Sequence, residues 1–439
     1  MTKGARSGQR TAYINARLLD PANGLDEAGA LLTDGAVIAD IGPRLFAEGP
    51  PEDAAVVDCG GLCLSPGLID MRVFLGEPGA EHKETIASGS QAAAAGGVTT
   101  IIATPDTDPV IDNPALVEFV IRQAQDTAAV NVLPMASITK GCEGAEMAEM
   151  GMLASAGAVA FTDGQRTIGD ASVMRRALAY ASTFDLLIDH HAEEPDLAGD
   201  GCMNDGEMAT RLGLAGIPAA AETIIVKRDL CLVELTGARY HAAGLSTAGA
   251  VAAIREAKQR GLRVTCAIAP HHFTLNELGI GDYRTFAKIS PPLRSENDRQ
   301  AMVDALKDGT IDVISSAHTP EDTESKRQPF ARAAYGTVGL ETLLPVAMEL
   351  YHGGHLTLLE VIGRLTARPA DLLGLACGRL ERGAPADLLA FDPDMPWRID
   401  AEALRSKAKN SAFDGHPVQG RAIRTIVAGE QVYSAMDAA

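Results

Sequence analysis

The chain has 439 residues, of which 46% are hydrophobic and 22% are charged, so it can bury a large core and is not expected to be disordered. Its 38 Lys and Arg residues stand against 58 Asp and Glu residues, and the formal net charge of −20 opposes binding to phosphate backbones and anionic membranes. We therefore expect neither nucleic acid nor a membrane as a partner.

The seven cysteines include no paired CxxC modules, which indicates reduced thiols rather than a disulfide framework. Cys59 and Cys63 are the one close pair, and without a second Cys or His cluster we interpret them as structural. The first residues, MTKGARSGQRTAYINA, lack the apolar segment of a signal peptide, and no run of about 18 apolar residues occurs. We expect a cytoplasmic protein.

Both ends of the chain have the texture of short strands. The segment 12–64 contains AYINARLLD, GALLT, AVIADIG and AVVD, separated by Asn-Gly, Asp-Gly and Gly-Pro turn signals, and no helix is evident there. After residue 384 the pieces ADLLAFD, RTIVAGE and QVYS continue this pattern. We predict that 1–64 and 385–439 form one small β-sandwich beside a larger domain at 65–384.

Between these ends, apolar strand-like runs alternate with helical segments such as Asp170 to Ser182 and Thr247 to Arg260. The runs are Leu68 to Val73, Val98 to Ala103, Val130 to Met135, Ala158 to Thr162, Leu186 to His191, Arg239 to Ala243, Arg263 to Ala269 and Ile311 to Ala317. Eight such units predict an α/β fold, a (β/α)8 TIM barrel, whose site lies at the C-terminal ends of the strands. A doubly wound open sheet is the alternative, but no G-x-G-x-x-G or Walker loop follows any strand.

The first two units show the local signals most clearly. The run Gly67 to Val73 has the length of a buried parallel strand, and the Ala-rich helix predicted at Glu81 to Ala95 stops at Gly96-Gly97, where glycine permits a left-handed cap. After the strand Val98 to Ala103, Asn113-Pro114 combines an N-cap with proline at the first helical position. A βαβα unit is therefore expected.

The same stretch, Ser65 to Asn113, resembles the signature of the dihydroorotases, members of the amidohydrolase superfamily. Their pattern reads roughly P-G-L-I-D-x-H-V-H-L-R-E-P-G, then H-K-E-T, A-A-A-A-G-G-x-T-T and M-P-N-T-x-P, and PGLID, EPG, HKET, AAAAGG and TT are present here. Where the resemblance implies two zinc-binding His residues, the chain has Arg72 and Phe74. The implied substrate-binding Arg and Asn are replaced by Gly76 and Asp106.

The later strand ends are compared with the family in the same way. The resemblance implies that Asp163, in Phe161-Thr162-Asp163-Gly164, and His191, in HHAEEP, are retained metal-ligand positions. It also implies that Gly244 replaces a ligand His and that Ala317 replaces the Asp that serves as metal ligand and general base. Two further substrate positions are changed, with Ser290 in place of Asn and Glu321 in place of His.

These replacements predict a site without catalysis. Two remaining ligands are fewer than the three or more that zinc sites ordinarily use, so we expect no zinc and no other cofactor, although active relatives carry zinc. Asp106 and Glu321 place negative charge where an acidic substrate would bind. The resemblance, from about Ala12 to Tyr433, implies a non-catalytic dihydroorotase homologue of pyrimidine biosynthesis. We expect it to be a structural partner of aspartate transcarbamoylase, in a homo-oligomer or hetero-oligomer.

Two alternatives remain at this point. In the first, the chain is an active dihydroorotase or related cyclic amidohydrolase whose metal ligands are relocated and drawn from His190, His241, His271 or His318. In the second, it is a metal-free enzyme or a small-molecule sensor. Two structural expectations follow as well. We expect Arg72 to donate to Asp163, and also to Asp106, in place of the metal, with exposure to solvent as the alternative. The charged segment Glu321 to Phe330 is the candidate docking segment.

Overall fold

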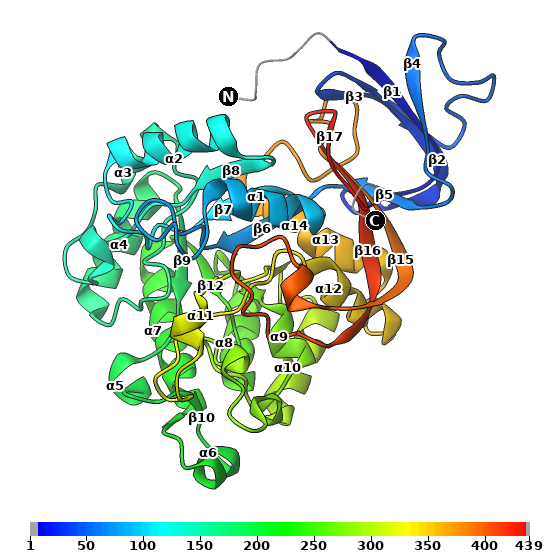
Figure 1. Ribbon diagram of the computed structural model, residues 1–439. Helices are drawn as coiled ribbons and strands as arrows, with labels where there is room; N and C mark the ends of the chain where they lie inside the picture. Colours follow the sequence, from blue (N-terminus) through cyan, green and yellow to red (C-terminus); the bar gives the residue numbers. More distant parts are fainter. Residues whose placement is uncertain (1–7, 436–439) are drawn as a thin grey trace.

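The computed structural model describes residues 8–435, whose central part is a closed barrel of parallel strands (Figure 1). Its strands in order around the ring are β6 (Leu68–Val73), β7 (Val98–Ala103), β8 (Asn131–Pro134), a bridging residue at Phe161, β9 (Leu187–His191), β12 (Arg239–Ala243), β13 (Val264–Ile268) and β14 (Val313–Ile314). Phe161 bridges Ala136 to Ile188, and a parallel bridge from Val73 to His318 closes the ring. The predicted TIM barrel is confirmed.

Two of the predicted strands are much shorter than expected, and β8, β9 and β13 lack one or two residues of the predicted runs. The run Ala158 to Thr162 contributes only the bridge at Phe161, although the Phe161 amide still donates to Leu187 and the Thr162 amide to Ala136. The run Ile311 to Ala317 is reduced to β14. At both places, backbone hydrogen bonds still connect the chain to the neighbouring strands. The ring is therefore closed even where the regular pairing between strands is interrupted.

The helices begin where the sequence supplies caps. Helix α1 (Ile86–Ala95) starts later than the predicted Glu81, because Thr85 and Ser88 form a capping box that sets its first turn. Gly97, with φ +83°, takes the left-handed position after it. Helix α2 (Pro114–Thr127) is capped by Asn113, as predicted. Helices α4 (Ala171–Thr183) and α8 (Ala248–Gln259) also agree with prediction.

The remaining helices and short strands belong to the outer helical layer or to the segments that follow the barrel strands. They are α3 (Met150–Ala156), α5 (Pro195–Ala198), β10 (Met203–Asn204), α6 (Glu207–Leu212), β11 (Gly216–Ile217), α7 (Ala219–Thr236), α9 (Pro270–Thr274), α10 (Glu296–Lys307), α11 (Thr323–Lys326), α12 (Leu343–His352), α13 (Leu358–Leu365) and α14 (Ala367–Leu373). No helix within residues 8–435 combines the length and the hydropathy needed to cross a bilayer.

The two ends of the chain meet in one hydrogen-bonded sheet at the side of the barrel, where blue and red strands lie together in Figure 1. Its strands are β1 (Arg10–Asp20), β2 (Leu25–Asp34), β3 (Val37–Gly42), β4 (Ala54–Asp58), β5 (Cys63–Pro66), β15 (Leu388–Arg398), β16 (Pro417–Val427) and β17 (Glu430–Ser434). The pairing of β5 with both β1 and β15 joins the N-terminal and C-terminal strands. The terminal segments therefore share one small β unit, and the exact domain limits stay predictions.

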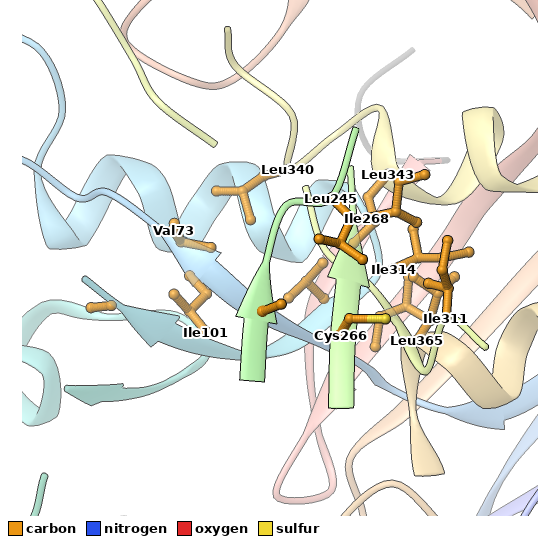
Figure 2. Packing of buried hydrophobic residues seen from close by; sticks show 14 of the residues in the cluster. Val73, Ile101, Leu245, Cys266, Ile268, Ile311, Ile314, Leu340, Leu343 and Leu365 are labelled. Atoms are coloured by element: carbon orange, nitrogen blue, oxygen red, sulfur yellow. The ribbon is translucent and has the colours of Figure 1, made fainter. Parts of the chain in front are cut away.

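Gly67 is the single residue between the terminal sheet and the first barrel strand. A Cβ atom there would lie 2.1 Å from the side chain of Thr99, so only glycine fits where the chain enters the barrel. Beyond this point the core fills the space between barrel and helices. Figure 2 shows Ile268 of β13 near Leu343 of α12, while Val73 of β6 and Ile101 of β7 lie on the side of Leu340. This packing does not depend on the polar side chains at the strand ends.

Candidate functional site

Arg72 extends from the end of β6 into the interior of the barrel. Its Nη1 atom lies 2.8 Å from Oδ1 of Asp189 on β9, and its Nη2 atom donates to the carbonyl oxygen of Gly164. The Asp189 side chain is only 2% exposed and that of Arg72 is 12% exposed. A guanidinium keeps its charge at any ordinary pH, so a fixed cation stands at one of the predicted ligand positions.

The expected pairing of Arg72 with Asp163 is therefore wrong in its partner. Asp163 instead accepts hydrogen bonds from the amides of Ile138 and Thr139, both at 2.9 Å, and from the Thr139 hydroxyl at 2.5 Å. Burial raises the pKa of Asp163, while these donors act in the opposite direction. Its carboxylate oxygens are thus held by the segment that follows the neighbouring strand β8.

His191 lies beside Arg72 but does not pair with it. Its Nε2 atom is 3.3 Å from the hydroxyl of Ser290, a position predicted to contact substrate. Burial, and then the positive charge of Arg72, lowers the pKa of His191 to about 3. The imidazole ring of His191 is consequently neutral at physiological pH. His191, a predicted metal-ligand position, and Ser290, a predicted substrate position, contact each other.

The other two replaced ligand positions have left-handed backbone. Gly244 has φ +62°, and Ala317 has φ +51°, a conformation that alanine rarely adopts. Neither residue has a side chain that can bind a metal or accept a proton. Phe74, the remaining replaced ligand position, donates its backbone N–H to the carbonyl of His318 at 2.9 Å and so helps to close the barrel.

The replaced substrate positions are also built differently from a pocket for an acid. At Gly76, with φ +68°, a Cβ atom would lie 2.6 Å from the carbonyl oxygens of Ala80 and Glu84, which leaves no room for an arginine. The carboxyl group of Asp106 packs against Gly164, where a Cβ atom would meet it at 2.3 Å. Oδ1 of Asp106 is buried and has no hydrogen-bond partner among the described residues.

Glu321, the last of these positions, faces a lysine instead of a substrate. Its carboxylate is 2.9 Å from Nζ of Lys83 and accepts from the Ser325 hydroxyl at 3.2 Å. The Lys83 side chain is 25% exposed, so this ion pair lies at the border between barrel and solvent. It joins the loop after β6 to the segment after β14.

The histidines considered as substitute ligands have other partners. His190 contacts Asp229 at 2.7 Å and accepts from the Ile168 amide, while His241 contacts the Thr265 hydroxyl at 2.8 Å. The remaining two lie apart from these: the ring of His271 packs against His272, and Nδ1 of His318 accepts from the Gly339 amide. Within residues 8–435, no three His, Cys, Asp or Glu side chains are arranged to hold a metal ion. The donors present do not fit zinc.

Asp189 is the residue that the sequence analysis missed. It occupies the same strand as His191, two positions earlier, and alternation along a strand places both side chains on the inner face. In the strand register, Asp189 is paired with His241 on the adjacent strand β12. Period-two alternation within Leu187–His191 was the available signal for an acidic group inside the barrel.

The chain was compared with protein families and with curated proteins. A family model described as dihydro-orotase-like matches residues 61–249. A curated dihydroorotase from Anaplasma phagocytophilum is 45% identical over 427 residues, covering 97% of this chain and 95% of the relative. A curated dihydroorotase from Pelobacter propionicus is 45% identical over 419 residues, covering 95% of this chain and 98% of the relative.

Solved structures are similar over the same length. The L-hydantoinase (dihydropyrimidinase) from Arthrobacter aurescens has a TM-score of 0.87 at 25% identity and covers 97% of this chain and 96% of its own. The dihydropyrimidinase from Brevibacillus agri NCHU1002 has a TM-score of 0.85 at 22% identity, covering 97% and 95%. The second likeness concerns the fold alone.

Proposed function

Since the chain belongs to the dihydroorotase family, we propose that it is a non-catalytic dihydroorotase homologue of pyrimidine biosynthesis that acts as a structural partner of aspartate transcarbamoylase. The observation that carries the first part of this proposal is the ion pair between Arg72 and Asp189. It fills a predicted ligand position, close to His191, with a guanidinium that cannot bind a metal and that is already paired with a carboxylate.

Hydrolysis of a cyclic amide at a metal centre needs an activated water and a group that moves its proton. The side chain at Ala317 can accept no proton, and Asp163 already accepts three hydrogen bonds. His191 is neutral and contacts Ser290. No arrangement of these residues supplies both functions, which supports the absence of turnover.

The proposed partnership depends on the folded barrel as a support for a docking segment, and not on the catalytic positions at the strand ends. Buried Lys326 donates to the carbonyl oxygens of Thr285, Lys288 and Ala334, and Phe330 is buried, so the segment Glu321 to Phe330 is fixed at both points. Glu324, just before Lys326, and Arg327 and Gln328, between Lys326 and Phe330, face solvent. A rigid segment with an exposed polar face is suited to docking because little conformational entropy is lost on binding.

The names of the curated relatives favour a second candidate, an active dihydroorotase that binds its metal through a rearranged site. These relatives are called dihydroorotase and cover nearly the whole chain. The two candidates differ in zinc content and in turnover. We expect purified protein to contain no stoichiometric zinc and to show no dihydroorotase activity in either direction. About one zinc per chain, with turnover that a chelator abolishes, would establish the second candidate.

A gain-of-binding variant tests whether the four changed ligand positions account for this loss. The combined changes Arg72→His, Phe74→His, Gly244→His and Ala317→Asp are expected to introduce zinc binding, measured by elemental analysis after dialysis. The same combination without Arg72→His, that is Phe74→His, Gly244→His and Ala317→Asp, is the matched control, because only Arg72 remains in place. Equal zinc content in both variants would contradict the assigned role of Arg72.

Co-expression with an aspartate transcarbamoylase catalytic chain tests the partnership separately. Obligate interfaces typically bury more than about 2,000 Å², so the complex should survive gel filtration. The substitutions Glu324→Lys and Arg327→Glu in the candidate docking segment are expected to weaken it. Transcarbamoylase that elutes alone, with unchanged activity and stability whether or not this chain is present, would reject the partnership.

A further inference from the structure

Residues 404–412, which we call the strap, lie between β15 and β16 and run from the terminal β unit onto the barrel (the orange-red loop beside α12 in Figure 1). Two carboxyl groups of the barrel hold its backbone. Glu341 accepts from two of its amides at 2.6 and 3.1 Å, and Glu84 accepts from a third at 3.1 Å. The Asn410 side chain donates to the carbonyl oxygen of Thr319 at 3.1 Å. The backbone of the strap is therefore fixed on the barrel along its length.

Inward and outward side chains alternate along the strap, and the outward ones are basic. Arg405 and Lys407 are exposed and Lys409 is partly exposed; we call these three the basic strip. The buried side chains between and beside them are Leu404, Ser406, Ala408 and Asn410. Three basic side chains in succession on one side are unexpected in a chain whose acidic residues outnumber its basic ones by 58 to 38.

The basic strip contacts neutral groups of its own chain. The guanidinium carbon of Arg405 lies 5.2 Å from the ring centroid of Tyr433, and Lys407 donates to the carbonyl oxygen of Glu81 at 2.7 Å. Lys409 donates to a carbonyl oxygen of the strap itself. Within residues 8–435, no carboxylate forms an ion pair with any of the three. The positive charges are thus held in place without being neutralised.

Acidic groups under and beside the strap compensate this charge only in part. Glu84 and Glu341 lie on its inner side, where amides of the strap occupy their oxygens. Burial raises the pKa of Glu341 to about 7, so this group is partly protonated at neutral pH. The carboxylate of Glu81 accepts from the amide of Gly79 at 2.9 Å. The outer side of the strap is therefore a positive area on an otherwise acidic protein.

We propose that the basic strip is a docking surface for a short acidic segment of another protein. Complementary charge selects this occupant, because three positive groups on a fixed backbone match carboxylates and lose little backbone entropy on binding. A long polyanion, such as nucleic acid or an anionic membrane, extends beyond the strip over surface that the net charge of −20 makes repulsive. A short segment avoids that repulsion, since charges farther away than about 8 Å are screened at physiological ionic strength.

The strap adjoins the candidate docking segment, because the amide of Glu321 donates to Oδ1 of Asn410 at 3.1 Å. The inference nevertheless does not rest on the proposed partnership with aspartate transcarbamoylase. The basic strip selects the chemistry of its partner and not its identity, so a test with an unrelated acidic peptide separates the two proposals.

Fluorescence anisotropy of a labelled peptide of alternating Glu and Gly residues measures this binding to the full chain. Binding should weaken as the ionic strength rises from about 0.01 M to about 0.15 M, which shortens the Debye length from about 30 Å to about 8 Å. A labelled peptide of alternating Gln and Gly residues is the control and should not bind. Equal binding of the two peptides would overturn the proposal.

The combined variant Arg405→Glu, Lys407→Glu and Lys409→Glu should raise the dissociation constant of the acidic peptide at least about tenfold, because three attractive contacts become repulsive. Changing the same residues to Gln keeps donors for the carbonyl oxygens and should give an intermediate value. Both variants retain the inward side chains of the strap, so their thermal unfolding should resemble that of the wild type.

A matched control makes the same change of net charge at exposed positions of α4 and α7, with Arg175→Glu, Arg176→Glu and Lys227→Glu. This variant should alter the dissociation constant less than about twofold, because distant charges are screened. Equal losses in the two glutamate variants would show that net charge, and not the basic strip, governs binding. A single-stranded oligonucleotide or vesicles of anionic lipid that bind the chain more tightly than the acidic peptide would also reject the assigned partner.

Discussion

Nη1 of Arg72 and Oδ1 of Asp189 lie 2.8 Å apart across the barrel interior, joining residues 117 positions apart in the chain. Each charge compensates the burial of the other, since Asp189 is 2% exposed and Arg72 is 12% exposed. The remaining guanidinium edge is satisfied by Gly164. The pair therefore connects β6 and β9 inside the barrel, in a region where the sequence predicts metal ligands.

Removing one partner of this pair should be costly. Arg72→Ala leaves a buried carboxylate unpaired, and the free energy of unfolding should fall by about 3 to 5 kcal/mol in urea titrations. The double variant Arg72→Met with Asp189→Leu removes both charges and should be close to wild type in stability. Arg10→Ala, which breaks the exposed Arg10–Asp53 pair, is the matched control and should change little. Similar losses of unfolding free energy in all three variants would contradict a stabilising role for the Arg72–Asp189 pair.

Ala317 should be more stable as glycine. Its φ of +51° is unfavourable for an L-residue, so Ala317→Gly is expected to raise the free energy of unfolding by about 1 kcal/mol. Ala179→Gly, at an exposed position inside α4, should lower it by about the same amount because helix interiors disfavour glycine. The two changes are chemically identical, so opposite signs in one denaturation assay test the backbone conformation. Destabilisation at both positions would refute it.

Two glycines with the same backbone conformation should respond differently to alanine. Gly76 and Gly244 have φ +68° and +62°, but a Cβ atom meets backbone oxygens at 2.6 Å at Gly76 and nothing nearer than 3.7 Å at Gly244. Gly244→Ala should cost about 1 kcal/mol of stability from the backbone alone. Gly76→Ala should cost at least about 2 kcal/mol, because rigid backbone must also move. Equal thermal shifts in both variants would show that the space around Gly76 is not restricted.

Stability should fall in mild acid because of His272. Burial lowers the pKa of His272 from 6.5 to about 4, and its Nε2 atom is 3.0 Å from the carbonyl of Pro291. Between these two pKa values the unfolded chain binds a proton that the folded chain does not, so folding free energy is lost as pH falls from 6.5 toward 4. The loss from this one residue approaches about 3 kcal/mol near pH 4.

The variant His272→Gln isolates this contribution, since it retains a donor for Pro291 and cannot titrate. Urea titrations at several pH values should give wild type and variant parallel curves above pH 7, where neither form of His272 is charged. Below pH 6 the wild type should lose stability more steeply. Parallel curves down to pH 4 would mean that His272 does not stay neutral in the fold.

Local signals in the sequence determined much of the fold. The bounds of β6, β7 and β12 agree with the predicted apolar runs, and Asn113, Asp170 and Thr247 cap the helices predicted to follow them. These features depend on residues close in sequence, because burial pattern and capping are short-range properties. The resemblance in the stretch Ser65 to Asn113 was likewise confirmed by relatives 45% identical over nearly the whole chain.

The partners of the charged residues at the strand ends were decided by the tertiary structure. The sequence identified Arg72 as a cation among predicted ligand positions, but it could not show that Asp163 would be held by Thr139 and that Asp189 would receive the guanidinium. Those choices depend on how the ring closes between Val73 and His318 and on the register that places Asp189 opposite His241. Contacts between strands distant in sequence are set by packing of the whole barrel, because no local pattern specifies which inward side chains come within hydrogen-bond distance.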